Sequence, residues 1–90
     1  MSTSYILKSV STGDTVCVLL VSDRDFIFND IQDFQAVEYI LKDFAKVLEL
    51  DIKLTSNTTE IVFHNIDTSM LPRLSRYMLL THKLILQKTR

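Results

Sequence analysis

Apolar and polar residues alternate along short stretches in the first third of the chain. Residues 4–10, SYILKSV, have the composition of a strand, and residues 15–22, TVCVLLVS, are rich in β-branched side chains. The only glycine of the chain stands beside Asp14 between these stretches, which is typical of a turn. We therefore expect a β-hairpin. The triplet FIF at 26–28 either extends a strand or packs as a loop.

A helical pattern follows the predicted hairpin. Asn29 or Asp30 can cap this helix, because a side-chain oxygen there accepts hydrogen bonds from free backbone N–H groups. Asp33 then falls in the first turn, where the positive end of the helix dipole favours an acid. The apolar residues recur at three- and four-residue steps and so share one face: Phe34, Val37, Ile40, Leu41, Phe44, Val47 and Leu48.

Two further strands are predicted after this helix. Residues 50–56, LDIKLTS, alternate, with Ile52 and Leu54 on one side and polar residues on the other. This pattern indicates a strand with one face in water. Residues 60–66, EIVFHNI, follow a polar turn and predict the next strand.

A second helix is predicted in the last quarter of the chain. Pro72 fits its first turn, where a missing N–H costs little. We expect the helix to run to about Gln87, although no glycine marks its end. An alternative ends the helix near Thr81 and makes 83–88, KLILQK, a fifth strand. Three residues can cap its start: Asp67, Thr68 and Ser69.

The order of these elements, β-β-α-β-β-α, predicts a single α+β domain over residues 1–90. A chain of 90 residues holds one core, and a hydrophobic content of 47% is typical of a globular protein. The simplest packing is two-layered, with a four-stranded, mainly antiparallel sheet and both helices on one face. The two hairpin-plus-helix units share an architecture but little residue similarity.

The second predicted strand is more apolar than a strand with one wet face should be. Its two faces carry two apolar sets: Val16, Val18 and Leu20 on one side, and Cys17, Leu19 and Val21 on the other. One set covers the core, and the other is exposed unless something covers it. The alternative is that FIF covers the far face. We assign self-association, as a homodimer, to the second set: Cys17, Leu19 and Val21.

Charge is divided unevenly along the chain, although the net charge is only −1. Residues 1–67 hold five basic and eleven acidic residues, whereas residues 68–90 hold five basic residues and no acid. The cations could face the chain's own acids, nucleic acid, a membrane surface or an acidic protein. We favour the chain's own acids and an acidic protein, which includes a second copy, because apolar residues are interleaved with the cations.

A partner-binding surface is accordingly predicted on the second helix, with an apolar centre and a cationic rim. A nucleic-acid-binding regulatory protein that uses the same basic face is the alternative function. The isoelectric point of about 6.0 and the lack of an aromatic platform count against it. The predicted partner-binding residues are Arg73, Arg76, Leu80, Lys83, Leu84 and Gln87.

Candidate chemistry is sparse, and we predict a protein without catalytic residues, metal or cofactor. Cys17 lies in an apolar strand, where burial makes a thiol inert. His64 and His82 are the only histidines, so no closely spaced ligand set arises. Three aspartates resemble a cation loop only loosely, because the glycine and closing glutamate of such a loop are missing: Asp23, Asp25 and Asp30.

The longest apolar run, VCVLLV, has six residues, far fewer than the roughly twenty of a membrane-spanning helix. The first residues lack the pattern of a secretory signal, and one cysteine cannot form an internal disulfide. We therefore expect a small cytoplasmic adaptor, assembly or regulatory module that binds itself or another protein.

Overall fold

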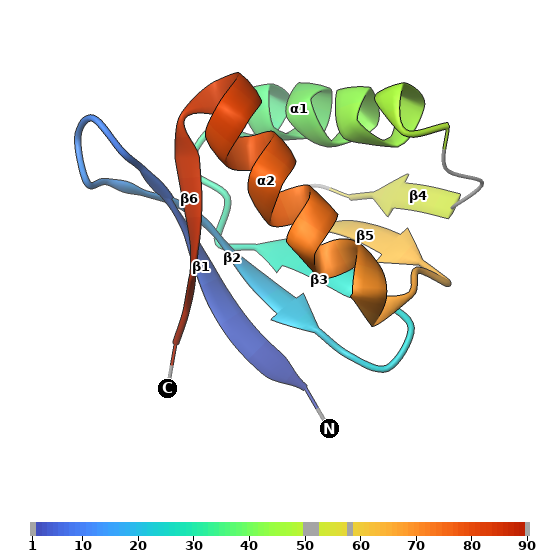
Figure 1. Cartoon of the computed structure of the whole chain (residues 1–90). Coiled ribbons are helices and arrows are strands. Elements are labelled where there is room, and N and C mark those ends of the chain that lie inside the picture. The colour runs from blue at the N-terminus through green and yellow to red at the C-terminus, as the bar shows by residue number, and fades with distance from the viewer. Residues whose placement is uncertain (1, 50–52, 58, 90) are drawn as a thin grey trace.

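The computed structural model describes residues 2–49, 53–57 and 59–89. Six strands form one sheet in the order β4-β5-β3-β2-β1-β6, and every pairing is antiparallel. Both helices lie on the same face of this sheet (Figure 1). The α+β class is confirmed, but the predicted four strands are six. The elements are β1 (Thr3–Ser9), β2 (Thr15–Val21), β3 (Phe26–Asn29), α1 (Phe34–Val47), β4 (Lys53–Ser56), β5 (Ile61–His64), the 3-10 turn η1 (Thr68–Met70), α2 (Leu71–His82) and β6 (Leu84–Lys88).

The first additional strand is the FIF stretch. Strand β3 pairs with β2 on one side and with β5 on the other, so it joins the two predicted hairpins into one sheet. The alternative that FIF covers the far face of β2 is therefore wrong. Phe26 and Phe28 are buried and Ile27 points the other way, which is the alternation expected of a strand with one covered face.

The second additional strand is β6, which pairs with β1 at the edge of the sheet. The prediction that α2 continues to Gln87 is wrong, and the alternative with a strand at the C-terminal end is correct. The helix stops because Lys83 takes the left-handed conformation, with φ 57° and ψ 41°, and its N–H donates to the carbonyl of Leu79. Glycine usually occupies such a position, so a lysine there does not indicate a helix end in the sequence.

Side-chain hydrogen bonds cap α1 and η1, whereas the N-cap of α2 is Met70, which makes no side-chain cap bond, so none of the three predicted caps is at the start of α2 itself. Asp33 caps α1, accepting from the N–H of Ala36 at 3.2 Å, whereas the predicted caps lie elsewhere: Asn29 ends β3 and Asp30 has a positive φ of 49°. Asp67 caps η1 by accepting from the N–H of Ser69 at 2.9 Å, and this bond lowers the pKa of the Asp67 carboxyl. Pro72 lies in the first turn of α2, as predicted.

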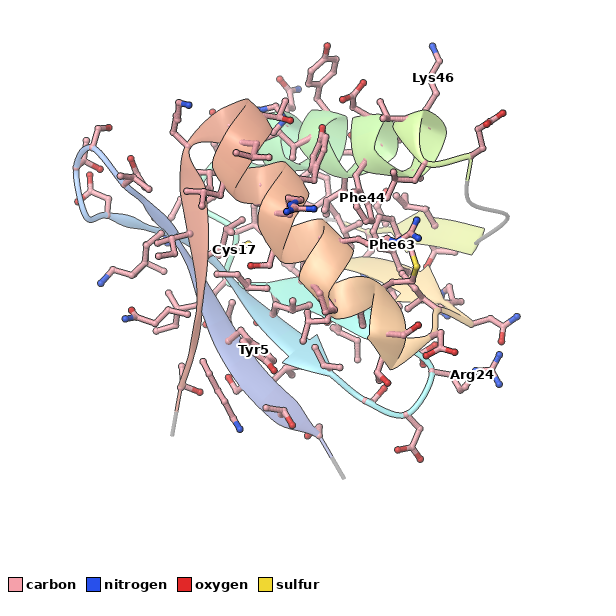
Figure 2. The ribbon with its side chains drawn as sticks, viewed as in Figure 1. Tyr5, Cys17, Arg24, Phe44, Lys46 and Phe63 are labelled. Atoms are coloured by element: carbon pink, nitrogen blue, oxygen red, sulfur yellow. The ribbon has the colours of Figure 1, made fainter. Side chains whose placement is uncertain are left out.

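The core fills the space between the helices and the sheet. Phe63 from β5 contacts Phe28 edge-on at 5.8 Å between ring centroids and stacks on Phe44 from α1 at 6.1 Å. Figure 2 shows Phe44 and Phe63 side by side beneath the helices. The predicted apolar face of α1 is buried at its centre, but Val47 at its end is exposed. In the predicted strand 50–56, Ile52 lies outside the described residues.

The two helices are joined through Tyr77 on α2. Its hydroxyl donates to the Oδ2 atom of Asp43 on α1 at 2.6 Å and lies 2.9 Å from the Nε2 atom of His82. Removal from water and the bond to Asp43 raise the pKa of Tyr77 above its ordinary value. Of the described helices, which have at most 14 residues, none is long and apolar enough to cross a membrane.

Candidate interaction surface

The face of the sheet that points away from the helices carries a continuous set of apolar side chains. The strand register places Leu20 opposite Ile27, and Ile27 opposite Val62. Side chains directly opposite on neighbouring strands lie on the same face, about 5 Å apart, so these contact one another. Ile6 is opposite Val18 in the next row of the same face. The apolar strip therefore consists of Ile6, Val18, Leu20, Ile27 and Val62, all half-buried.

The apolar strip has no cover from the described part of the chain. Both helices lie on the opposite face, as Figure 1 shows, and their buried residues contact the other side of the strands. Ile85 on the edge strand β6 lies on the outer face beyond Lys8 and is 43% exposed. An apolar patch that remains accessible to solvent on a small domain often marks an interface.

The three residues to which we assigned self-association face the other way. Cys17 and Leu19 are 0% exposed and Val21 is 7% exposed, all beneath the helices. The prediction that this set is the outward one is wrong, because both faces of β2 are equally apolar and the alternation alone does not say which face the helices cover. Burial raises the pKa of the Cys17 thiol to about 12, as expected for an inert cysteine.

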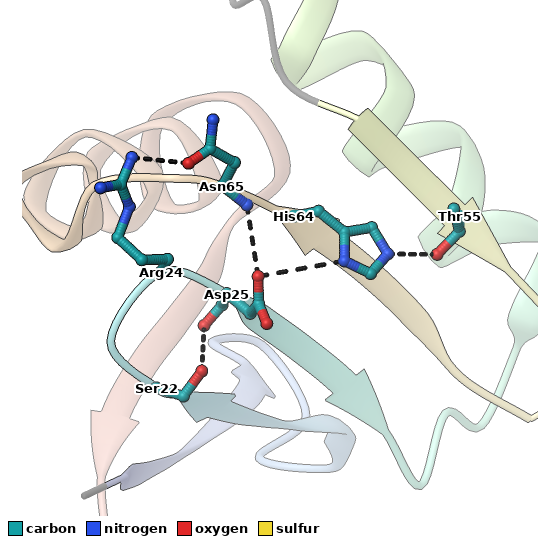
Figure 3. Close-up of polar contacts among 6 residues, drawn as sticks. All are labelled: Ser22, Arg24, Asp25, Thr55, His64 and Asn65. Carbon is teal, nitrogen blue, oxygen red and sulfur yellow. Dashed lines mark hydrogen bonds and ion pairs between the residues drawn. The ribbon is translucent and has the colours of Figure 1, made fainter.

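Polar side chains border the apolar strip at both ends of the strands. At one end, Thr55 Oγ1 lies 2.7 Å from His64 Nε2, and His64 Nδ1 lies 3.9 Å from Asp25 Oδ1 (Figure 3). Lys8 lies on the same face at the other end, opposite Ile85. The outer face thus has an apolar centre, an acid at one end and a cation at the other.

Asp25, His64 and Thr55 place a carboxylate, an imidazole and a hydroxyl side by side, as in a catalytic triad, but the geometry does not support one. The 3.9 Å separation is too long for a hydrogen bond, and Asp25 Oδ1 already accepts from the N–H of Asn65 at 3.2 Å. The side chains of His64 and Asp25 are about 40% exposed on an open face, where water can hydrogen-bond to both of them. Asn65 also accepts from Arg24 Nη2 at 2.6 Å, so the network ties the β2–β3 turn to β5.

A separate hollow of about 520 Å³ opens between the β1–β2 turn and the start of α1. Two acids lie in it, and one of them, Asp33, already caps the helix. Within residues 2–49, 53–57 and 59–89, no three His, Cys, Asp or Glu side chains are close enough to hold a metal ion. The hollow therefore gives no evidence of a metal site. Its lining residues are Ser9, Thr12, Asp14, Thr15, Val16, Gln32 and Asp33.

The predicted partner-binding residues do not share one helix face. Arg73, Arg76 and Leu80 are exposed on α2, and Leu80 is 66% exposed. Beyond the helix end, Lys83 lies in the turn and the others lie on β6. The prediction of one surface is therefore wrong for Lys83, Leu84 and Gln87, because α2 stops at His82. The side chain of Leu84 packs in the core, and Gln87 is on the outer face of the sheet, opposite Ile6.

The cations of the C-terminal segment lack acidic partners among the described residues. The salt bridge between described residues is that of Lys42 with Glu38 at 3.7 Å, and His64 lies 3.9 Å from Asp25; neither contact involves a cation of the C-terminal segment. The contact between α1 and α2 uses the neutral hydroxyl of Tyr77 instead. The described part of the chain therefore leaves four cations without a carboxylate neighbour: Arg73, Arg76, Lys83 and Lys88.

Comparison of the chain with protein-family models, with curated proteins and with solved structures finds no match in any of the three. Function must therefore be inferred from the surface itself. Two features of that surface stand out: the apolar strip that the described residues leave uncovered, and the cations around α2 and β6 that have no acidic neighbour among the described residues.

Proposed function

We propose that this protein is a non-catalytic interaction module that associates with itself by stacking the outer faces of two sheets. The observation that carries this proposal is the apolar strip, centred on Leu20 and Ile27, which the described chain leaves uncovered. Burying apolar surface is favourable by about 25 cal/mol per Å². Two sheets packed face to face, about 10 Å apart, are a common way to achieve it.

The size of the outer face supports a weak, reversible dimer. Six strands spaced about 4.8 Å apart make the sheet about 24 Å wide, and strands of four to seven residues are about 13–23 Å long. Each copy would thus bury roughly 400–500 Å², compared with about 800 Å² per partner in a stable interface. We expect the dimer to form at micromolar or higher concentrations.

The charges at the ends of the outer face favour a second copy as the occupant. Lys8 lies at one end of the strands and Asp25 at the other. A two-fold axis that lies in the interface and runs across the strands turns one sheet over, so that the Lys8 end of each copy lies over the Asp25 end of its partner. Such rim charges steer association and fix the orientation rather than supplying much affinity.

The proposed role is to bring polypeptides together, as an adaptor or assembly protein does. The polar cluster around His64 connects strands and turns, and its acid lies too far from the imidazole to activate a nucleophile. A cytoplasmic location is part of the proposal. Cys17 is the only cysteine and lies in the core, so the fold would lose no internal disulfide in a reducing compartment.

Light scattering over a range of protein concentrations tests this function. We expect the mass of the wild type to rise towards that of a dimer, and Ile27→Glu to remain a monomer because it places a charge in the apolar strip. Tyr39→Glu is the matched control, because Tyr39 is exposed on α1, far from the outer face. A wild type that is monomeric at every concentration would contradict the proposal.

Nucleic-acid binding is a second candidate function, and the observation that favours it is the exposed cations of α2. Arg73 and Arg76 are exposed on the helix and have no described acidic neighbour. Binding to bulk duplex DNA or to RNA that weakens steeply with added salt, and that Arg73→Ala with Arg76→Ala abolishes, would support this candidate.

A further inference from the structure

The outer edge of β6 presents backbone groups that the sheet does not use. The N–H of Val10 donates to the carbonyl of Lys83 at 3.0 Å, and the N–H of Thr89 donates to the carbonyl of Ser4 at 2.9 Å. Bonded pairs alternate in an antiparallel ladder, so Ile85 and Gln87 also direct their backbone groups to β1. The alternate residues of the strand point their N–H and C=O groups away from the sheet: Leu84, Leu86 and Lys88.

This edge lacks the features that usually prevent strand addition. Natural edge strands carry a proline, a bulge or central charges that block pairing. Strand β6 has the sequence LILQK, which contains no proline, and its register with β1 is continuous. Its centre is apolar, and Ile85 is 43% exposed. The opposite edge strand, β4, has only four residues, and its described side chains include the polar Thr55 and Ser56.

Cations stand at both ends of the β6 edge. Lys83 precedes the strand and Lys88 ends it, so the two positions are about 17 Å apart at about 3.4 Å per residue. Neither has a described acidic neighbour, and the whole segment 68–90 contains no Asp or Glu. Charge complementarity therefore calls for a partner with acidic residues at a similar spacing.

A second copy of β6 does not meet this requirement. Outward groups pair with outward groups when two β6 strands lie antiparallel about Leu86, and this register places Leu84 of one copy opposite Lys88 of the other. This is the register that pairs all five residues of both strands, and it brings Lys83 of one copy and Lys88 of the other to each end of the paired strands. Like charges gathered at the same ends are destabilising, so the edge disfavours pairing with itself.

We propose that β6 binds an extended segment of another protein, with an apolar centre flanked by acidic residues, as a seventh strand of the sheet. The outward backbone groups of Leu84, Leu86 and Lys88 pair with the added strand, and Lys83 and Lys88 contact its acidic ends. Main-chain bonds supply affinity in this mode of recognition, and side chains supply specificity. The edge is a different surface from the outer face, so the proposal does not depend on self-association.

A synthetic peptide tests the proposal: Glu-Glu-Val-Ile-Val-Glu-Glu, blocked at both ends. We expect the amides of Leu84, Leu86 and Lys88 to exchange with solvent rapidly in the free protein and to gain protection when the peptide is added. The amides of Ile85 and Gln87 should be protected throughout, because they already bond to β1. The same peptide with Lys in place of every Glu is the charge control and should not bind.

Two variants of Leu86 separate backbone pairing from side-chain loss. Leu86→Ala keeps the outward N–H, whereas Leu86→Pro removes it without touching a bond to β1. We expect Leu86→Pro to bind the peptide at least tenfold more weakly than Leu86→Ala. If Leu86→Pro fails to fold, the double variant Lys83→Gln with Lys88→Gln gives the test, with an expected loss of about fivefold or more at low salt. Lys46→Gln on α1 is its control and should bind like the wild type.

The outcomes distinguish this proposal from the proposed function. Leu20→Glu, expected to be monomeric, should still bind the peptide. No protection of the three outward amides at millimolar peptide, or equal binding of the acidic and basic peptides, would overturn strand addition by an acidic segment. Binding of a single-stranded oligonucleotide that excludes the acidic peptide would assign the cations to nucleic acid instead and would also overturn it.

Discussion

Leu19 and Leu20 are neighbours in the chain, yet their side chains lie on opposite faces of the sheet. Leu19 is 0% exposed beneath the helices, whereas Leu20 is half-buried on the outer face opposite Ile27. The pleat of β2 causes this difference, because successive side chains of a strand point to opposite faces. Leu19 therefore contributes to the core, whereas Leu20 is available to a partner.

Truncation of the two leucines should have unequal effects on stability. Leu19→Ala leaves a cavity in the core, so we expect it to lower the free energy of unfolding by about 2–5 kcal/mol. Leu20→Ala should lower it by less than about 1 kcal/mol when the protein is monomeric. Urea unfolding at low protein concentration measures both values. Equal losses would contradict the assignment of faces.

The corrected faces also change what a charge at these positions should do. Leu19→Glu places a carboxylate in the core, and we expect it to unfold the protein rather than to dissociate an assembly. Leu20→Glu should stay folded and lose self-association. Circular dichroism measures folding and light scattering measures self-association in the two variants. A folded Leu19→Glu protein would count against the burial described for Leu19.

The bond from Tyr77 to Asp43 predicts a pH dependence of stability. Tyr77 has a pKa above its ordinary value of 10.0, because it is removed from water and donates to Asp43. Above pH 10 the unfolded chain loses this proton while the folded chain keeps it, so the contribution of Tyr77 to stability is complete below pH 10 and declines as the pH rises further.

Tyr77→Phe isolates this contribution. The variant lacks the hydroxyl, and we expect the free energy of unfolding to fall by about 1–2 kcal/mol at neutral pH. Its stability should then decline less than that of the wild type as the pH rises above 10. Parallel pH profiles of the two proteins would show that the bond to Asp43 contributes nothing to the folded state.

The Cys17 thiol should be unreactive in the native protein. It is fully buried and its pKa is raised to about 12, so the thiolate that attacks a disulfide reagent is scarce and inaccessible. We expect labelling by a chromogenic disulfide at pH 8 to be slow in buffer and complete at once in denaturant. Rapid labelling without denaturant would contradict the position of Cys17 beneath the helices.

Lys83→Gly should stabilise the monomer. Lys83 ends α2 in the left-handed conformation, which costs a residue with a Cβ about 1 kcal/mol and glycine very little. Part of this gain is offset by the greater freedom of glycine in the unfolded chain, so we expect a net increase of about 0.5 kcal/mol. A matched Lys42→Gly change at an exposed position in the middle of α1 should destabilise the protein, because glycine weakens a helix interior. Thermal unfolding compares the two.

Most of the elements could be predicted from the sequence, because their hydrophobic periods are clear. The span of α1 follows from its apolar face, although the cap is Asp33 rather than Asn29 or Asp30. The sequence alone does not decide strand β3, because three residues fit a loop as well as a strand. The end of α2 is not visible in the sequence, because the residue in the left-handed conformation there is a lysine and not the glycine that usually marks a helix end.

The interaction surface could be predicted in kind but not in place. The excess of apolar residues in β2 is visible in the sequence, but Leu19 and Leu20 are equivalent there, and only the packing of the helices decides between them. Likewise, the run of cations is visible, but its division between α2, the turn at Lys83 and β6 depends on where the helix stops. Partners far apart in the sequence, such as Ile27 and Val62, emerge only from the register of the sheet.

Methyl-detected NMR of the wild type in a dilution series tests self-association through the outer face most directly. We expect the methyl resonances of Ile6, Leu20 and Ile27 to shift with protein concentration, while those of Leu74 in the core and Leu80 on α2 stay constant. Resonances that are all independent of concentration, or that shift at Leu80 and not at Ile27, would contradict the account.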